Sequence, residues 1–76
     1  MVEKILFNLN ENWRVGQDDL QWMLQKKEGD SWNPKAYIRG HKDALMVVIR
    51  ENSVGNITDE ARRELGKLRS KFTKAE

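Results

Sequence analysis

Side chains that commonly serve in catalysis are scarce in this sequence. It contains one histidine, His41, and no cysteine. Nucleophilic catalysis needs a nucleophile, an adjacent base and a third group that orients the base, and a single imidazole beside Gly40 does not supply that set. Motifs for a zinc protease or a glycine-rich phosphate loop do not occur either. We expect His41 to lie at a turn before a helix, where it could cap that helix, contact a phosphate or remain in solvent.

One group of polar side chains has the spacing of a calcium-binding loop. Its members are Asn8, Asn10, Asn12 and Asp19. Trp13, however, occupies the position at which such a loop requires glycine, and the first ligands would be neutral amides. The adjacent Asp18 and Asp19 would point to opposite sides of an extended chain, so they form no acid–base pair, and we expect them to form a turn. The sequence therefore predicts a protein that is not an enzyme and carries no metal or cofactor.

Basic residues recur at helical spacing near the end of the chain. They are Arg63, Lys67, Lys71 and Lys74, and at about 100° per residue they fall on one face of a helix. Such a stripe could follow a phosphate backbone or meet an acidic protein surface. The alternative is a solvated helix whose acidic start and basic end complement its dipole and need no ligand. The formal net charge of +2 would give only modest long-range attraction.

Aromatic residues with basic neighbours are the other candidates for a partner-binding surface. The residues concerned are Trp13, Lys26, Lys27, Trp32, Tyr37 and Arg39. Each ring could be half exposed, where it would anchor a protein interface or stack on a base, or it could lie in the core. Trp22 alternates in phase with Leu20 and Leu24, which indicates a core position. The other face of residues 20–26 holds no aromatic residue, which argues against an open sheet that binds single-stranded nucleic acid.

Alternation of apolar and polar residues predicts strands in the first forty residues. The segments are 5–9, 13–15, 20–26 and 32–39, and turn-forming residues rich in Asn, Asp and Gly separate them. Strands joined by such short turns form an antiparallel meander with one apolar face.

The pattern changes to a helical period in the second half. Four residues recur at spacings of four, three and four in one apolar stripe: Ala61, Leu65, Leu68 and Phe72. Since Thr58 is a typical N-cap, we expect a helix over about 59–74. Residues 42–53 fit a helix or a buried strand; we favour a helix, because Gly55 stands where a helix-terminating glycine would. The predicted fold is α+β, a three- to four-stranded antiparallel meander followed by two α-helices packed on one sheet face.

A chain of 76 residues allows a single compact domain over residues 1–76. A core of this size without disulfides is marginally stable, so a homodimer or folding onto a partner is an open possibility. The sequence begins without a long apolar run of the secretory type. The longest apolar stretch, residues 44–49, is too short to span a bilayer. We therefore expect a cytoplasmic protein and no membrane partner.

A longer pattern resembles a group of small uncharacterised phage and prophage proteins. It reads Trp13-Arg-Val-x-x-Asp18-x-x-Gln21-Trp22-x-Leu24-Gln25-Lys26, then Gly29-x-x-Trp32 and Tyr37, then Ala44-Leu45 and a charged closing helix. Those proteins share a W-x-V/I-x-x-D-x-x-Q-W-x-L hairpin, a G-x-x-W turn, a tyrosine before the first helix and a final L-x-x-L helix. The resemblance covers residues 13–72. The turn at 28–31 is shorter than in many of them, and Ala36 takes a place often held by an aromatic residue; both could change a binding edge.

The resemblance implies a phage or mobile-element origin. Small non-enzymatic proteins of that origin often block a surface of a host machine, CRISPR–Cas complexes included. The first hypothesis is therefore an anti-CRISPR-like inhibitor that binds a host protein or ribonucleoprotein complex. The alternative is a small nucleic-acid-binding accessory protein that uses the basic face of its C-terminal helix, and a third is an obligate dimer module. Fold and origin do not determine function by themselves.

Overall fold

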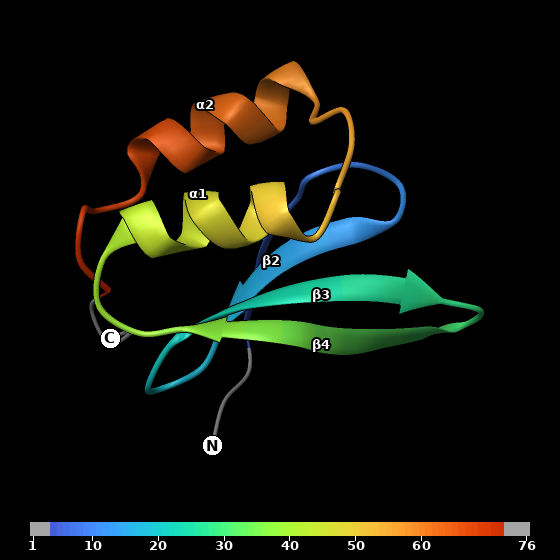
Figure 1. The fold of residues 1–76 in the computed structure, drawn as a ribbon, viewed down its shortest axis with the longest axis horizontal. Helices are drawn as coiled ribbons and strands as arrows, with labels where there is room; N and C mark the ends of the chain where they lie inside the picture. Colours follow the sequence, from blue (N-terminus) through green and yellow to red (C-terminus); the bar gives the residue numbers. More distant parts are fainter. Residues whose placement is uncertain (1–3, 73–76) are drawn as a thin grey trace.

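The computed structural model describes residues 4–72 (Figure 1). Its elements are β1 (Lys4–Asn8), β2 (Trp13–Gln17), β3 (Trp22–Glu28), β4 (Ser31–Ile38), α1 (Lys42–Glu51) and α2 (Asp59–Lys67). The four strands form one open antiparallel sheet in the order β1-β2-β3-β4. The predicted α+β fold, an antiparallel meander followed by two helices, is confirmed.

One face of the sheet is apolar because cross-strand pairing brings apolar residues together. Val15 opposes Leu24, which opposes Ala36, and Trp22 opposes Ile38. Paired residues of antiparallel strands project to the same face, so these side chains form one continuous layer. Val15 and Leu24 are fully buried, and Trp22 is 3% exposed.

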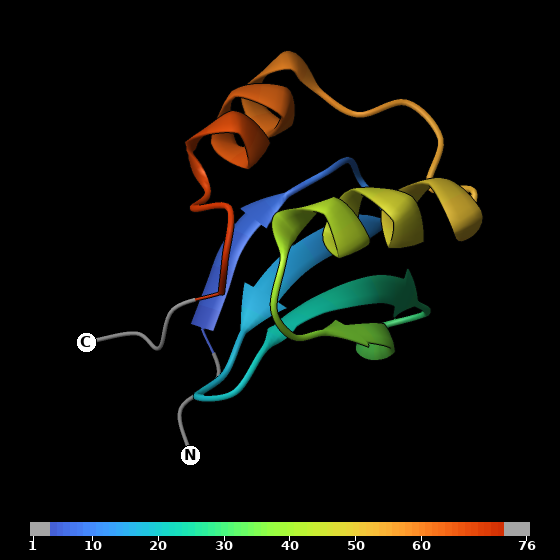
Figure 2. The same ribbon diagram turned by 60° about the vertical axis from the view of Figure 1, so that its left-hand side comes forward.

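Both helices lie on one side of the sheet in Figures 1 and 2. α1 contributes Leu45 and Ile49, α2 contributes Ala61 and Leu65, and all four belong to the same buried cluster as the apolar sheet residues. Spacing of four residues places each pair on one face of its helix. Full burial of a leucine such as Leu45 contributes about 2 kcal/mol. Since α1 spans Lys42–Glu51, residues 44–49 are helical, as predicted, and not a strand.

β1 departs from regular alternation. Its pairing with β2 shifts between Ile5 and Phe7. Phe7 consequently packs against the core, whereas Ile5 is 41% exposed.

Leu20 lies in a turn before β3 and not in the core layer with Trp22. Asp18 Oδ1 accepts hydrogen bonds from the backbone N–H groups of Leu20 (2.7 Å) and Gln21 (3.0 Å). These bonds hold Leu20 outside the strand, where it is 56% exposed. The role in turn formation predicted for Asp18 is confirmed, and the predicted inward position of Leu20 is wrong.

Asn10 joins the turn between β1 and β2 to the loop between the helices. Its Oδ1 accepts hydrogen bonds from the N–H groups of Asn12 (2.9 Å) and Trp13 (3.0 Å). Its Nδ2 donates to the carbonyl oxygens of Val54 and Asn56, both at 3.0 Å. One amide side chain therefore connects segments that are far apart in the sequence.

The two helix starts differ in how they are capped. Thr58 Oγ1 accepts a hydrogen bond from the N–H of Ala61 at 3.1 Å, which confirms the predicted N-cap of α2. The N–H of Thr58 also donates to the carbonyl of Leu9 at 3.0 Å and so ties this helix start to the sheet. His41 precedes α1, but its side chain makes no capping hydrogen bond to the described residues of that helix.

α2 ends at Lys67, so the predicted helix over 59–74 is too long. Leu68 has the extended angles φ −62° and ψ 144°. The ammonium group of Lys42 donates to the carbonyl oxygens of Leu65 (3.3 Å) and Leu68 (3.2 Å). A cation at this end of a helix binds free carbonyl groups and interacts favourably with the helix dipole.

Beyond α2 the chain runs back beside the residues that precede α1. Lys71 forms an isolated antiparallel bridge with His41, and the N–H of Phe72 donates to the carbonyl of Gly40 at 2.6 Å. The Phe72 ring then meets Trp22 edge-on, with centroids 5.5 Å apart. Phe72 thus reaches the core from extended backbone and not from a helix.

α1 also ends earlier than the predicted boundary at residue 53. The backbone N–H and the side-chain amide of Asn52 both donate to the carbonyl of Val48, at 3.0 and 2.9 Å. Ser53 then takes the left-handed conformation, with φ +55°. Gly55 also has a positive φ, +87°, but it lies farther along the loop and does not terminate the helix.

Replacing Asn10 by Ala removes all four of its hydrogen bonds. We expect Asn10→Ala to lower the free energy of unfolding by at least about 2 kcal/mol, because each of the four bonds contributes roughly 0.5–1.5 kcal/mol net. Urea denaturation measures this. Asn56→Ala is the matched control, since it keeps the carbonyl acceptor, and a similar loss in both variants would contradict the role of Asn10.

Replacing Lys42 by Met removes the ammonium group from the C-terminal end of α2 and retains most of the side chain's apolar length. We expect Lys42→Met to destabilise the fold by about 1–2 kcal/mol. The control is Arg62→Met at an exposed position of α2. It should change stability by less than about 0.5 kcal/mol. Thermal and urea denaturation followed by circular dichroism compare the two, and equal effects would contradict the capping role.

Candidate binding surface

The sheet face opposite the core carries side chains from all four strands. Alternation along the strands and pairing between them place these residues together. They are Ile5, Asn8, Arg14, Gly16, Met23, Gln25, Lys27, Trp32, Pro34 and Tyr37, and we call them the open face. Neither α1 nor α2 covers this side in Figures 1 and 2.

An arginine–tryptophan stack lies on the open face, toward the end of the sheet that carries the β3–β4 turn. The guanidinium carbon of Arg14 is 4.2 Å from the centre of the Trp32 ring. Arg14 Nε also donates a hydrogen bond of 2.6 Å to Oε1 of Gln25, its cross-strand partner. Gln25 is only 3% exposed, so the acceptor that orients the guanidinium is itself fixed. A cation over a tryptophan ring contributes about 0.5–2 kcal/mol.

Tyr37 and Met23 form the next cross-strand pair of the open face. Met23 is 5% exposed and Tyr37 is 57% exposed. A Cβ atom at Gly16 would lie 3.6 Å from Met23 Cε and 3.1 Å from the carbonyl oxygen of Lys4, so glycine leaves room for this packing. The aromatic ring, and not the methionine, is therefore presented to solvent.

At one end of the open face, hydrogen bonds connect the side chains of Arg39, Gln21 and Asp18. Arg39 Nε donates to Gln21 Oε1 at 3.2 Å, and Gln21 Nε2 donates to Asp18 Oδ2 at 3.2 Å. The N–H of Leu20, the side-chain and backbone N–H groups of Gln21, and the charge of Arg39 together hold the pKa of Asp18 below its ordinary value of 3.8. Arg39 is exposed beside Tyr37 at this end.

The structure separates the predicted partner-binding residues into two groups. Lys27, Trp32, Tyr37 and Arg39 lie together on the open face or at its end. Trp13 points to the core and is 7% exposed, so of the two positions considered for it the structure shows the core position and not the exposed anchor. It alternates with Val15 toward the helices, and the Lys26 ammonium lies 5.5 Å from its ring centre on that same side.

The outer face of residues 20–26 holds no aromatic residue, as the sequence indicates, but this segment is only one strand of the sheet. That segment contributes no ring to the open face, but the neighbouring strand β4 contributes Trp32 and Tyr37. Arg14 was not among the predicted binding residues. Its position depends on the register that pairs it with Gln25, and this cross-strand pairing is the signal that a strand-by-strand interpretation lacks.

The basic stripe predicted on the C-terminal helix is interrupted. Arg63 and Lys67 are exposed on α2, and Lys67 Nζ lies 3.8 Å from Glu64. Lys71 lies beyond the helix in the bridge to His41. Lys74 lies outside the described residues.

An open groove of about 860 Å³ lies between α2 and the end of β1. Its lining residues are Phe7, Asn8, Asn10, Glu11, Thr58, Glu60, Ala61, Arg63, Glu64 and Lys67. Three of these are carboxylates and two are cations, so the groove suits a polyanion poorly.

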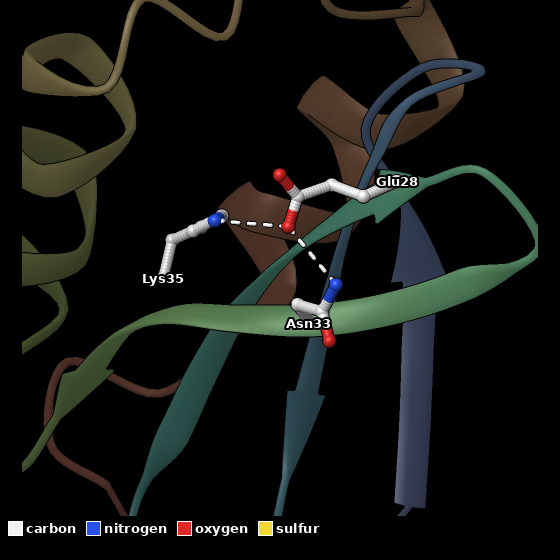
Figure 3. A network of polar contacts seen from close by, with 3 residues as sticks. All are labelled: Glu28, Asn33 and Lys35. Atoms are coloured by element: carbon white, nitrogen blue, oxygen red, sulfur yellow. Dashed lines mark hydrogen bonds and ion pairs between the residues drawn. The ribbon is translucent and has the colours of Figure 1, made fainter.

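A polar network stabilises the hairpin that carries Lys27 and Trp32 (Figure 3). Glu28 Oε1 accepts from Lys35 Nζ and from Asn33 Nδ2, each at 2.9 Å. These contacts, that of Lys35 above all, hold the pKa of Glu28 below its ordinary value of 4.5. They join β3 to β4 near the tip of the hairpin.

Within residues 4–72, no group of three or more His, Asp or Glu side chains is placed to hold a metal ion. No helix in this part of the chain is long and apolar enough to cross a membrane. Comparisons with protein-family models, curated proteins and solved structures found no match. The open face is therefore interpreted from its geometry and charge.

The lowered pKa values of Asp18 and Glu28 predict a stability that decreases in acid. A carboxylate with a depressed folded-state pKa stabilises the fold above its unfolded pKa, and this contribution is lost as pH falls through the folded value. We expect stability to decrease from about pH 5 downward, and Asp18→Asn to weaken that decrease. Urea denaturation at several pH values measures it. Glu28→Gln tests the second carboxylate separately, and an unchanged pH dependence in both variants would contradict the assignment.

Proposed function

We propose that this chain is a non-enzymatic protein that binds a host defence complex through the open face and blocks it. It would act in the host cytoplasm as an anti-CRISPR-like inhibitor of phage or mobile-element origin. The observation that supports binding is the gathering of Arg14, Trp32, Tyr37 and Lys27 on one face that neither helix covers. Aromatic and arginine side chains supply most of the binding energy in protein interfaces.

The open face offers groups suited to recognition and not to bond-making. None of its residues is a serine, histidine or carboxylate, and its charged members Arg14 and Lys27 are cations. Such a surface complements a partner with acidic or phosphate groups. A ribonucleoprotein complex presents both kinds of group. The choice of a defence complex as the target derives from the resemblance of residues 13–72 to phage proteins.

The alternative, nucleic-acid binding through the C-terminal helix, receives less support. Its basic stripe is interrupted at Leu68, and the groove beside Arg63 and Lys67 contains carboxylates. The sheet, and not α2, therefore presents the more uniform positive surface.

Expressing the chain in bacteria with an active CRISPR–Cas defence should restore infection by a targeted phage. Tyr37→Ala combined with Lys27→Glu should reduce this relief by at least about tenfold, which corresponds to losing about 1.4 kcal/mol of binding. Plaque counts measure the effect. Leu20→Ala, at an exposed position outside the open face, is the control and should retain full relief. If the unsubstituted chain restores phage infection against none of the defence systems in a representative panel, the proposed function is wrong.

A further inference from the structure

We propose that the open face is a platform for single-stranded nucleic acid. Unpaired bases would stack on Tyr37 and on the Arg14–Trp32 pair, while Lys27 and Arg39 contact phosphates. This inference rests on the proposed function, because it takes the open face as the binding surface. It adds the chemical class of the partner.

Two planar groups stand at separate positions along the same strand. Trp32 pairs with Lys27 and Tyr37 pairs with Met23. Because Lys27 and Met23 are four residues apart on β3, the backbone positions that carry the two rings are separated by about 13 Å along the sheet. Bases stack on aromatic rings and on arginine guanidinium planes alike. The face thus provides two stacking positions with a gap between them.

Cations accompany each stacking position. Lys27 is exposed beside Trp32, and Arg39 is exposed beyond Tyr37. The residues that form the open face include no carboxylate. Asp18 approaches only at the end, where Gln21 connects it to Arg39. Single-strand-binding proteins combine aromatic rings on which bases stack with cations that follow the phosphate backbone, and this face holds both kinds of group.

An acidic protein surface is a poorer match for what this face presents. The centre of a protein interface is apolar surface that becomes buried on binding. Here the central residues Met23 and Gln25 are already buried in the free chain, at 5% and 3% exposed, so they offer a protein partner little apolar surface. Ile5 and Tyr37 are the large exposed side chains of the face, and Tyr37 has a polar end. Solvent therefore meets Tyr37 and Lys27 together with the small apolar surfaces of Ile5 and Pro34, and no broad apolar patch.

Single strands fit this face better than duplexes. Stacking on Tyr37 requires a base that is not already stacked and paired. The face of a four-stranded sheet is also too broad to enter a major groove as a helix does. Specificity for base identity is not expected, since rings and cations recognise features common to all bases.

The test is fluorescence anisotropy with the full chain and fluorescein-labelled oligo(dT) and oligo(U) of about twelve nucleotides, at about 50 mM salt and above. We expect binding that weakens steeply with salt. Tyr37→Ala should raise Kd by about tenfold, since stacking contributes about 1–3 kcal/mol per base. Circular dichroism must show that each variant is folded.

Matched charge reversals identify the surface. Lys27→Glu with Arg39→Glu should abolish binding at about 50 mM salt, because two phosphate contacts are replaced by repulsion. Arg63→Glu with Lys67→Glu changes the net charge by the same amount on α2 and should leave Kd within about threefold. Equal losses from both pairs would overturn the proposal, because binding would then reflect net charge alone.

Further probes separate the other possible partners. The proposal is overturned if neither oligonucleotide binds, if a hairpin duplex binds as tightly as the single strands, or if poly-glutamate does so. Failure here is distinguishable from failure of the proposed function. Defence relief that requires Tyr37 without oligonucleotide binding would retain the inhibitor and indicate a protein surface as partner. Oligonucleotide binding without relief would retain the platform and reject the inhibitor.

Discussion

The packing of α1 and α2 against a single face of the sheet determines what the rest of the surface is. Side chains alternate along each strand, so Val15 and Leu24 can enter the core only if Arg14 and Gln25 project the other way. A shift of one residue in the register would exchange the two sets and would place the guanidinium of Arg14 under the helices. The apolar core therefore specifies the position of the polar and aromatic groups outside it.

The helices are held there by polar contacts as well as by the core. α2 has nine residues, which is too short for an isolated helix to be stable in water. Thr58 caps its start, Asn10 fixes the loop before it, and Lys42 binds its last carbonyl groups. In a small chain without disulfides, side chains that bind backbone of distant segments take over part of the role of a covalent link.

Local patterns predicted what local forces determine. The four strands, the N-cap at Thr58 and the turn at Asp18 follow from neighbouring residues, and all three are present. The end of α2 was not predictable in this way, since Phe72 reaches the core equally well from a helix or from extended chain paired with residues 40–42. The candidate surface was predicted in part. Trp32 and Tyr37 were predicted as candidate binding residues, but their position on the same face as Arg14 depends on pairing across three strands.

The same register shows where Ala36 and the turn at 28–31 lie relative to the open face. Ala36 opposes Leu24 on the helix side and packs against the core, so the residue at this position affects the interior and not the open face. The short turn at 28–31 determines the pairing of Lys27 with Trp32 and therefore affects the open face. Because Gln25 and Trp32 already hold Arg14 in place, a ligand that meets this stack has less side-chain entropy to remove. That preorganisation favours any ligand that contacts the stack without requiring it to rearrange.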